Sequence, residues 1–155
     1  MTADEVDHFV APARVFSRQH ALAVPAPVPA RPGVYGWWFR RWPSPIAADD
    51  CSRHRGLALL YVGISPKQPP RNGRPASKQN LAERIRYHYT GNAEGSTLRK
   101  TLGCLLADEF GIQLRRVGSG SRMTFGAGEQ ALSAWMAENA LSAGWSAGPG
   151  GEPNG

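Results

Sequence analysis

The chain has 155 residues, of which 41% are hydrophobic, and a formal net charge of +6. This length predicts one domain, and no apolar run approaches the ~20 residues that a membrane-spanning helix needs. The acidic start, MTADEVDHF, lacks the apolar core of a secretory signal, and Cys51 and Cys104 lack the spacing of a zinc site. We therefore expect a cytoplasmic protein with no membrane partner, whose basic surface favours nucleic acid.

The first 31 residues are interpreted as an N-terminal extension. A short helix is expected within residues 10–22, and the proline-rich VPAPVPARP then predicts an extended approach to the domain. Two strands follow, over residues 33–40 and 57–64, because both stretches are rich in aromatic and β-branched residues. We expect these strands to pair as an antiparallel hairpin with a long connection.

A helix is predicted to begin after a basic, proline-rich loop at residues 65–79. Asn80 is a suitable N-cap, and Glu83 three residues later gives a capping-box pattern. Apolar side chains recur every four residues, which is typical of the buried stripe of a helix. These are Leu81, Ile85 and Tyr89.

The last third of the chain predicts two more helices and a short hairpin. Ser96 or Thr97 can cap a helix that runs through TLRKTLGCLLADEF. IQLRRV and RMTF predict a hairpin around GSGS, and residues 128–141 form an amphipathic helical pattern. Residues 142–155 are glycine-rich, so we interpret them as a disordered tail that follows a domain at residues 32–141.

Three short motifs occur in a fixed order along this domain. GVY ends at Tyr35 on the first strand, YVG begins at Tyr61 on the second, and NLxxRxxxH on the next helix places Arg84 and His88 four residues apart. Together they resemble the GIY-YIG nuclease family over roughly residues 32–140. The segments GSTLR and WMAEN resemble a bacterial subgroup of it. The resemblance implies an α/β (α+β) fold, with a small antiparallel three-stranded sheet flanked by helices.

The resemblance also implies catalytic roles for the four motif residues. Tyr35 matches a general base or water-positioning tyrosine, and Tyr61 a tyrosine that orients phosphate or water. Arg84 matches an arginine that contacts the scissile phosphate, which suits the bidentate geometry of a guanidinium. His88 falls where relatives carry a tyrosine or histidine near the leaving group or the attacking water. Without the family pattern, Tyr35 and Tyr61 would be interpreted as core tyrosines with satisfied hydroxyls.

One divalent ion, Mg²⁺ or Mn²⁺, is implied as the cofactor, and such a hard cation needs an oxygen ligand. Glu129 is the best-placed candidate by its order along the chain, and Glu138 is the second. An acidic residue in the first turn also stabilises a helix through its dipole, which is the alternative explanation of Glu129. In the subgroup that the chain resembles, a further strand and helix follow, and that helix bears the metal-binding glutamate. This chain turns glycine-rich after Leu141.

Basic residues on the two middle helices are candidates for binding phosphates: Arg86, Arg99 and Lys100. They could equally form a solvated basic surface. DNA is the expected partner, and RNA is an alternative.

The sequence therefore predicts a metal-dependent endonuclease that hydrolyses phosphodiester bonds in DNA. The main alternative is a catalytically weak or inactive nucleic-acid-binding module that keeps the fold but lacks the metal-binding glutamate. A third hypothesis is a structural subunit that docks a partner through an exposed tryptophan-rich surface.

Overall fold

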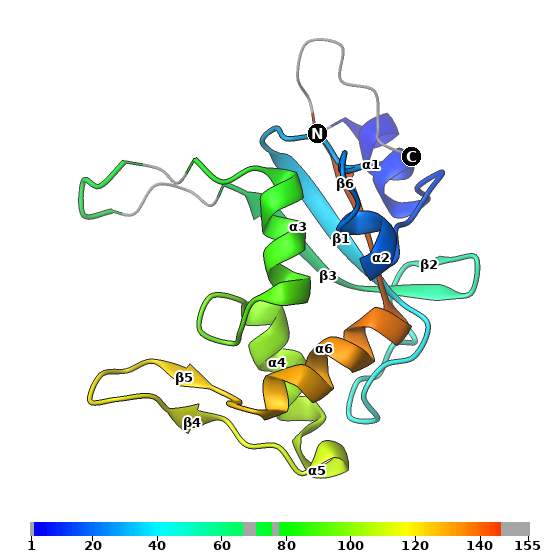
Figure 1. Ribbon diagram of the computed structural model, residues 1–155. Helices are drawn as coiled ribbons and strands as arrows, with labels where there is room; N and C mark the ends of the chain where they lie inside the picture. The colour runs from blue at the N-terminus through cyan, green and yellow to red at the C-terminus, as the bar shows by residue number, and fades with distance from the viewer. Residues whose placement is uncertain (1, 67–70, 76–77, 147–155) are drawn as a thin grey trace.

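The computed structural model describes residues 2–66, 71–75 and 78–146. It is an α+β fold in which helices pack on a four-stranded sheet, and a separate two-stranded ribbon projects from the body (Figure 1). The helices are α1 (Ala3–Val10), α2 (Arg18–Ala21), α3 (Leu81–Thr90), α4 (Thr97–Leu105), α5 (Ala107–Phe110) and α6 (Gly128–Asn139). The strands are β1 (Gly33–Phe39), β2 (Arg53–His54), β3 (Leu57–Ser65), β4 (Arg115–Arg116), β5 (Met123–Thr124) and β6 (Ala140–Trp145). No helix in the described ranges is long and apolar enough to cross a membrane.

The main sheet is antiparallel, with the strand order β2-β3-β1-β6. The predicted pairing of the first two long strands is confirmed, with Tyr35 opposite Gly63 and Trp37 opposite Tyr61. The α+β class is confirmed, but the sheet has four strands and not three. Besides β1 and β3, the sheet contains the two-residue β2 and the C-terminal β6.

Strand β6 corrects the predicted boundary of the tail. The prediction of disorder is wrong for Ser142 and Gly144, because both belong to β6 and pair with Trp37 and Tyr35 of β1. Four of the six residues in ALSAGW are small, and only Leu141 and Trp145 are bulky, so the pairing of this strand depends on the strand beside it rather than on propensity. Residues 147–155 of the predicted tail lie outside the described residues.

The secondary structure of the N-terminal extension also differs from the prediction. It forms α1 and α2 instead of one helix over residues 10–22. Between them, Phe16 pairs with Ser142: the Phe16 N–H donates to the Ser142 carbonyl at 2.7 Å, and the Ser142 N–H donates back at 2.9 Å. The extension therefore covers the outer edge of β6, which would otherwise expose unpaired backbone groups.

Alternate side chains of β1 face opposite sides of the sheet and build two apolar clusters. Tyr35, Trp37 and Phe39 face α3 and α6 in the main core. Trp38 faces the other side, against Leu57. None of the 5 tryptophans is exposed. The exposed aromatic patch that the docking-subunit hypothesis requires is therefore absent from the described part of the chain.

Candidate active site

Helix α3 presents Arg84 and His88 to the sheet. The Asn80 side chain accepts the Glu83 N–H at 3.0 Å and caps the helix as expected. The predicted apolar stripe is buried, which fixes the rotation of the helix. Arg84 and His88 are buried beside that stripe, with relative exposures of 7% and 0%.

His88 joins the first motif to the third. Its Nε2 lies 2.9 Å from the Tyr35 hydroxyl, and its ring is surrounded by three aromatic rings. The centroid distances to Tyr35, Trp37 and Tyr61 are 5.4, 5.6 and 5.9 Å. The structure thus brings Tyr35, Tyr61 and His88 together from β1, β3 and α3.

Gly63 explains why the second motif contains a glycine. It lies directly opposite Tyr35 on the neighbouring strand. A Cβ atom at Gly63 would collide with the Tyr35 hydroxyl and ring. Any side chain at this position would therefore displace the hydroxyl from His88.

The loop that precedes α4 holds both functional side chains of α3. Nη1 of Arg84 donates to the Gly95 carbonyl at 2.9 Å, and Nδ1 of His88 lies 2.7 Å from Oγ of Ser96. Ser96 Oγ also accepts the Arg99 N–H at 3.1 Å, so the residue caps α4 as predicted. The contact of this cap with His88 could not be predicted from the sequence, because it depends on how the loop folds back onto α3.

Replacing Ser96 with alanine is expected to have two separable effects. Loss of the N-cap should lower the free energy of unfolding by about 1 kcal/mol. His88 loses the Nδ1 partner that orients its ring but keeps its contact with Tyr35, so the phosphodiester cleavage that the resemblance implies should slow. Chemical denaturation and a cleavage assay measure the two effects. Ser96→Thr keeps a hydroxyl, so recovery of activity in that variant supports the orienting role, and equal loss in both variants contradicts it.

Burial raises the pKa of the Tyr35 hydroxyl above its ordinary value. The Arg84 guanidinium opposes this shift, and Tyr61 adds to it. Tyr35 is therefore a neutral hydroxyl at neutral pH, and the phenolate form of a general base is disfavoured in the free protein.

Because burial raises the pKa values of two tyrosines, we expect the protein to lose stability at high pH. Burial raises the pKa of Tyr89 as well. In the unfolded chain a tyrosine loses its proton near pH ~10, whereas folded Tyr35 and Tyr89 retain theirs. The folded state then binds more protons, so the free energy of unfolding should fall as the pH rises above about 10. Urea denaturation on both sides of that pH measures the slope. Tyr35→Phe and Tyr89→Phe should each flatten it, and an unchanged slope in both variants would contradict this explanation.

Glu129 is occupied by protein contacts. Its Oε1 accepts from Nε and Nη2 of Arg99 at 3.2 and 3.0 Å. Its Oε2 accepts the backbone N–H groups of Ala93 and Phe125 at 3.1 and 3.0 Å. The side chains of the ion pair, Arg99 and Glu129, have relative exposures of 0% and 15%. The effect of an acidic residue on the helix dipole is therefore only part of the role of Glu129. Its carboxylate also connects α6 to α4 and to two loops.

The placement of Arg99 on a basic surface is wrong. Besides Glu129, its guanidinium donates to the carbonyls of His88 and Tyr89 at 3.1 Å each. It also donates to Ser133 Oγ at 2.9 Å. These contacts bury the whole side chain and leave no donor for a phosphate. Arg99 instead ties the end of α3 to α6.

The predicted ligand Glu129 is not available to a divalent metal ion in this arrangement. Both oxygens of Glu129 already accept two hydrogen bonds each, and no group of three or more His, Cys, Asp or Glu side chains in the described ranges could hold a metal. Glu138 is exposed at the other end of α6, beside a pocket of about 420 Å³ that contains none of the motif residues.

The other two predicted phosphate ligands lie on the surface. Arg86 is exposed, but its Nη2 donates to the carbonyl of Leu22 at 3.2 Å, which directs it toward the N-terminal extension. It is also two residues from Arg84 and thus on the opposite side of α3. Lys100 is exposed on α4.

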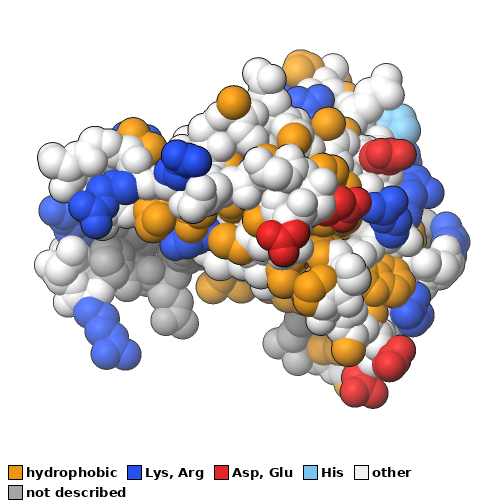
Figure 2. All heavy atoms as spheres, turned by 90° about the horizontal axis from the view of Figure 1, so that it is seen from below, with side chains coloured by type: hydrophobic (Ala, Val, Ile, Leu, Met, Phe, Trp, Pro, Cys, Tyr) orange, Lys and Arg blue, Asp and Glu red, His pale blue; other side chains and the backbone are white. Residues whose placement is uncertain are grey.

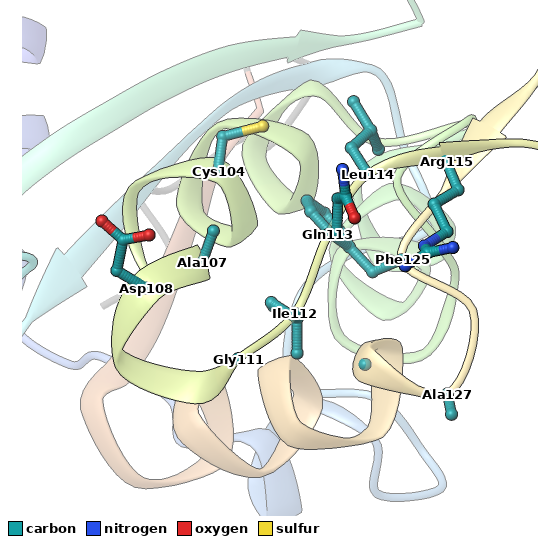
Figure 3. Close-up of a pocket in the computed structure, with 11 residues that line it drawn as sticks. Cys104, Ala107, Asp108, Gly111, Ile112, Gln113, Leu114, Arg115, Phe125 and Ala127 are labelled. Carbon is teal, nitrogen blue, oxygen red and sulfur yellow. The ribbon is translucent and has the colours of Figure 1, made fainter.

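A second pocket, of about 650 Å³, lies between α4, α5 and the base of the β4–β5 ribbon (Figure 3). Its lining includes Cys104, Asp108 and Arg115, and none of the four motif residues. The hollow in Figure 3 is therefore distinct from the motif cluster, which is a buried hydrogen-bonded group with Tyr61 partly exposed at its edge.

Comparison with known proteins supports the assignment from the motifs. The family model described as GIY-YIG catalytic domain matches residues 33–147, a span that contains Tyr35, Tyr61, Arg84 and His88 and extends past β6. Comparisons with curated proteins and with solved structures found no match. Because the family model covers most of the chain and all three motifs, the chain belongs to the GIY-YIG catalytic domain family, whose domains are of the nuclease type.

Proposed function

We propose that the chain is an endonuclease that hydrolyses phosphodiester bonds in DNA. One observation supports this most: His88 lies between the Tyr35 hydroxyl and Ser96, at 2.9 and 2.7 Å, in a cluster that also contains Arg84. A tyrosine in contact with a histidine can pass on a proton, and a guanidinium beside them can bind a phosphate. These are the two requirements of phosphodiester hydrolysis, a water to deprotonate and a negative charge to stabilise.

The proton path runs from the attacking water through Tyr35 to His88. When Nδ1–H of His88 donates to Ser96 Oγ, Nε2 carries no proton and accepts the hydrogen bond from the Tyr35 hydroxyl. The water oxygen forms a bond to phosphorus, its proton moves to the Tyr35 oxygen, and the Tyr35 proton moves to Nε2. The bond from phosphorus to the leaving oxygen breaks, and that oxygen takes a proton from solvent. Arg84 donates hydrogen bonds to the phosphoryl oxygens, and Tyr61 orients the phosphate or the water.

The requirement for one Mg²⁺ or Mn²⁺ ion stays a prediction of the family membership. Magnesium is often held by few protein carboxylates together with waters and substrate phosphates. Such an ion would supply further charge stabilisation at the phosphate when the substrate is bound.

A plasmid-nicking assay tests the proposal. Supercoiled plasmid is incubated with the purified protein and Mg²⁺ or Mn²⁺, with EDTA as the control. The proposal predicts conversion to the nicked form in the presence of either ion and none with EDTA. A folded protein that leaves plasmid intact with both ions contradicts it. The same assay on single-stranded and duplex RNA separates DNA from RNA as the substrate.

The alternative is an inactive nucleic-acid-binding module, and the occupied carboxylate of Glu129 favours it. This alternative predicts salt-sensitive binding of DNA without cleavage. The nicking assay therefore separates the two functions, because binding is common to both.

We also propose a cytoplasmic location. Cys51 and Cys104 are both free, and unpaired cysteines are typical of a reducing compartment. Thiol titration of protein purified without reductant tests this, since an intermolecular disulfide in the cell would contradict it.

A further inference from the structure

We infer that the two-stranded ribbon formed by β4 and β5, residues 114–124, is an arm that enters the major groove of duplex DNA. This inference rests on the proposed nuclease function and specifies its substrate as a B-form duplex. The ribbon projects from the body on the side opposite to the β2 hairpin (Figure 1). We call residues 114–124 the arginine ribbon.

The arginine ribbon has positive charge and no negative charge. The stretch from residue 111 to 128 contains Arg115, Arg116 and Arg122 and no Asp or Glu, and all three arginines are exposed. Both ion pairs found in the described ranges, Arg41–Glu109 and Arg99–Glu129, lie outside the ribbon. Figure 2 shows Lys and Arg side chains, and no visible Asp or Glu, at the left of the view. Three uncompensated cations on one narrow element favour a polyanion as the partner.

The pairing register distributes these charges over both faces. Arg115 pairs with Thr124 and Arg116 pairs with Met123. The Val117 N–H donates to the Arg122 carbonyl at 2.8 Å, which continues the register. Because paired residues share a face and successive residues alternate, Arg115 and Arg122 lie on one face and Arg116 on the other.

This arrangement matches a duplex groove better than a flat surface. The major groove of B-form DNA is about 12 Å wide and admits a two-stranded ribbon, with a phosphate backbone on either side. Cations on both faces of a ribbon can then reach both backbones. The major groove of A-form RNA is too narrow for such an element, and a flat anionic surface would contact only one face.

The arginine ribbon is fixed to the loop that holds the catalytic side chains. The Met123 N–H on β5 donates to Oε2 of Glu94 at 2.8 Å. Glu94 directly precedes Gly95 and Ser96, which bind Arg84 and His88. At the base of the ribbon, the Phe125 N–H donates to Glu129 at 3.0 Å. DNA held by the ribbon would therefore have a defined position relative to the motif cluster.

A binding experiment tests the arm apart from catalysis. The ribbon variant carries Arg115→Gln, Arg116→Gln and Arg122→Gln. The control variant carries Arg40→Gln, Arg41→Gln and Arg53→Gln, three exposed arginines of which two follow β1 and one lies in β2. The two variants have the same net charge. Fluorescence anisotropy in EDTA measures the Kd for a labelled DNA duplex, for an RNA duplex of the same sequence and for one DNA strand, across a salt series. Thermal unfolding confirms that both variants fold.

Three phosphate contacts contribute about 3 to the slope of log Kd against the logarithm of the salt concentration. Their loss should raise Kd by about 10²-fold at 0.15 M salt. We expect the ribbon variant to bind the DNA duplex with a raised Kd and a smaller salt slope, and the control variant to show neither change. The unchanged protein should bind the DNA duplex more tightly than it binds the RNA duplex or the single DNA strand. Equal weakening in both variants, unchanged binding in the ribbon variant, or equally tight binding of duplex RNA would overturn the inference. The binding experiment is independent of cleavage. If the unchanged protein nicks plasmid and the ribbon variant binds DNA normally, only this inference is contradicted. Binding that depends on the ribbon, without nicking, contradicts only the nuclease.

Discussion

Glu129→Ala is expected to lower the free energy of unfolding by about 3–5 kcal/mol, because it leaves the guanidinium of a buried ion pair without its charge partner. Arg99 has no exposed surface, and two of its nitrogen atoms donate to this carboxylate. The change also removes the acceptor of the Ala93 and Phe125 N–H groups. Urea denaturation at neutral pH measures the effect.

Glu138→Ala is the matched control for this prediction. It removes an acidic side chain from the same helix, but Glu138 is exposed and should change stability by less than about 0.5 kcal/mol. Preserved stability of Glu129→Ala, together with a lost dependence of cleavage on Mg²⁺, would contradict the account and identify Glu129 as the metal ligand.

Arg84→Ala should lower the rate of plasmid nicking by about 10²–10³-fold, the usual effect of removing one donor that stabilises charge in a transition state. The guanidinium is held in place by the Gly95 carbonyl at 2.9 Å and lies over the Tyr87 ring, 5.7 Å from its centroid. Its Nε is buried and has no hydrogen-bond partner among the described residues. Loss of the Gly95 bond should cost only about 0.5–1.5 kcal/mol of stability.

Two further variants sharpen this test. Arg84→Lys keeps the charge but loses the planar fork, so it should recover part of the rate. Arg40→Ala removes an exposed arginine that follows β1 and should leave the rate unchanged. A rate for Arg84→Ala equal to that of the unchanged protein would show that the arginine only supports the loop.

The elements around the motifs could be predicted because their local patterns agree with their tertiary setting. The antiparallel pairing of β1 and β3, the capped helix α3 and its buried stripe all follow from residue type and spacing. The four-residue interval between Arg84 and His88 places them on one face of that helix. The meeting of Tyr35 with His88 followed only from the family resemblance, since the two residues lie on different elements.

The missed features depend on contacts between distant segments. Strand β6 contains mostly small residues, and its pairing with β1 and Phe16 cannot be seen in ALSAGW. Arg99 looks like a surface cation by its neighbours in sequence, but Glu129, thirty residues later, makes its burial possible. Ser96 was predicted as a cap, and its second contact, with His88, requires the loop between α3 and α4 to fold back.

The most direct test of the account is the initial nicking rate of Tyr35→Phe relative to the unchanged protein, measured with the unfolding free energy of both. Removing the hydroxyl breaks the 2.9 Å contact with His88 and leaves the ring in the core. The account predicts a loss of rate of about 10²-fold or more, with a stability change within about 1.5 kcal/mol. A Tyr35→Phe protein that nicks plasmid at the original rate would contradict it, because the hydroxyl would then have no part in the chemistry.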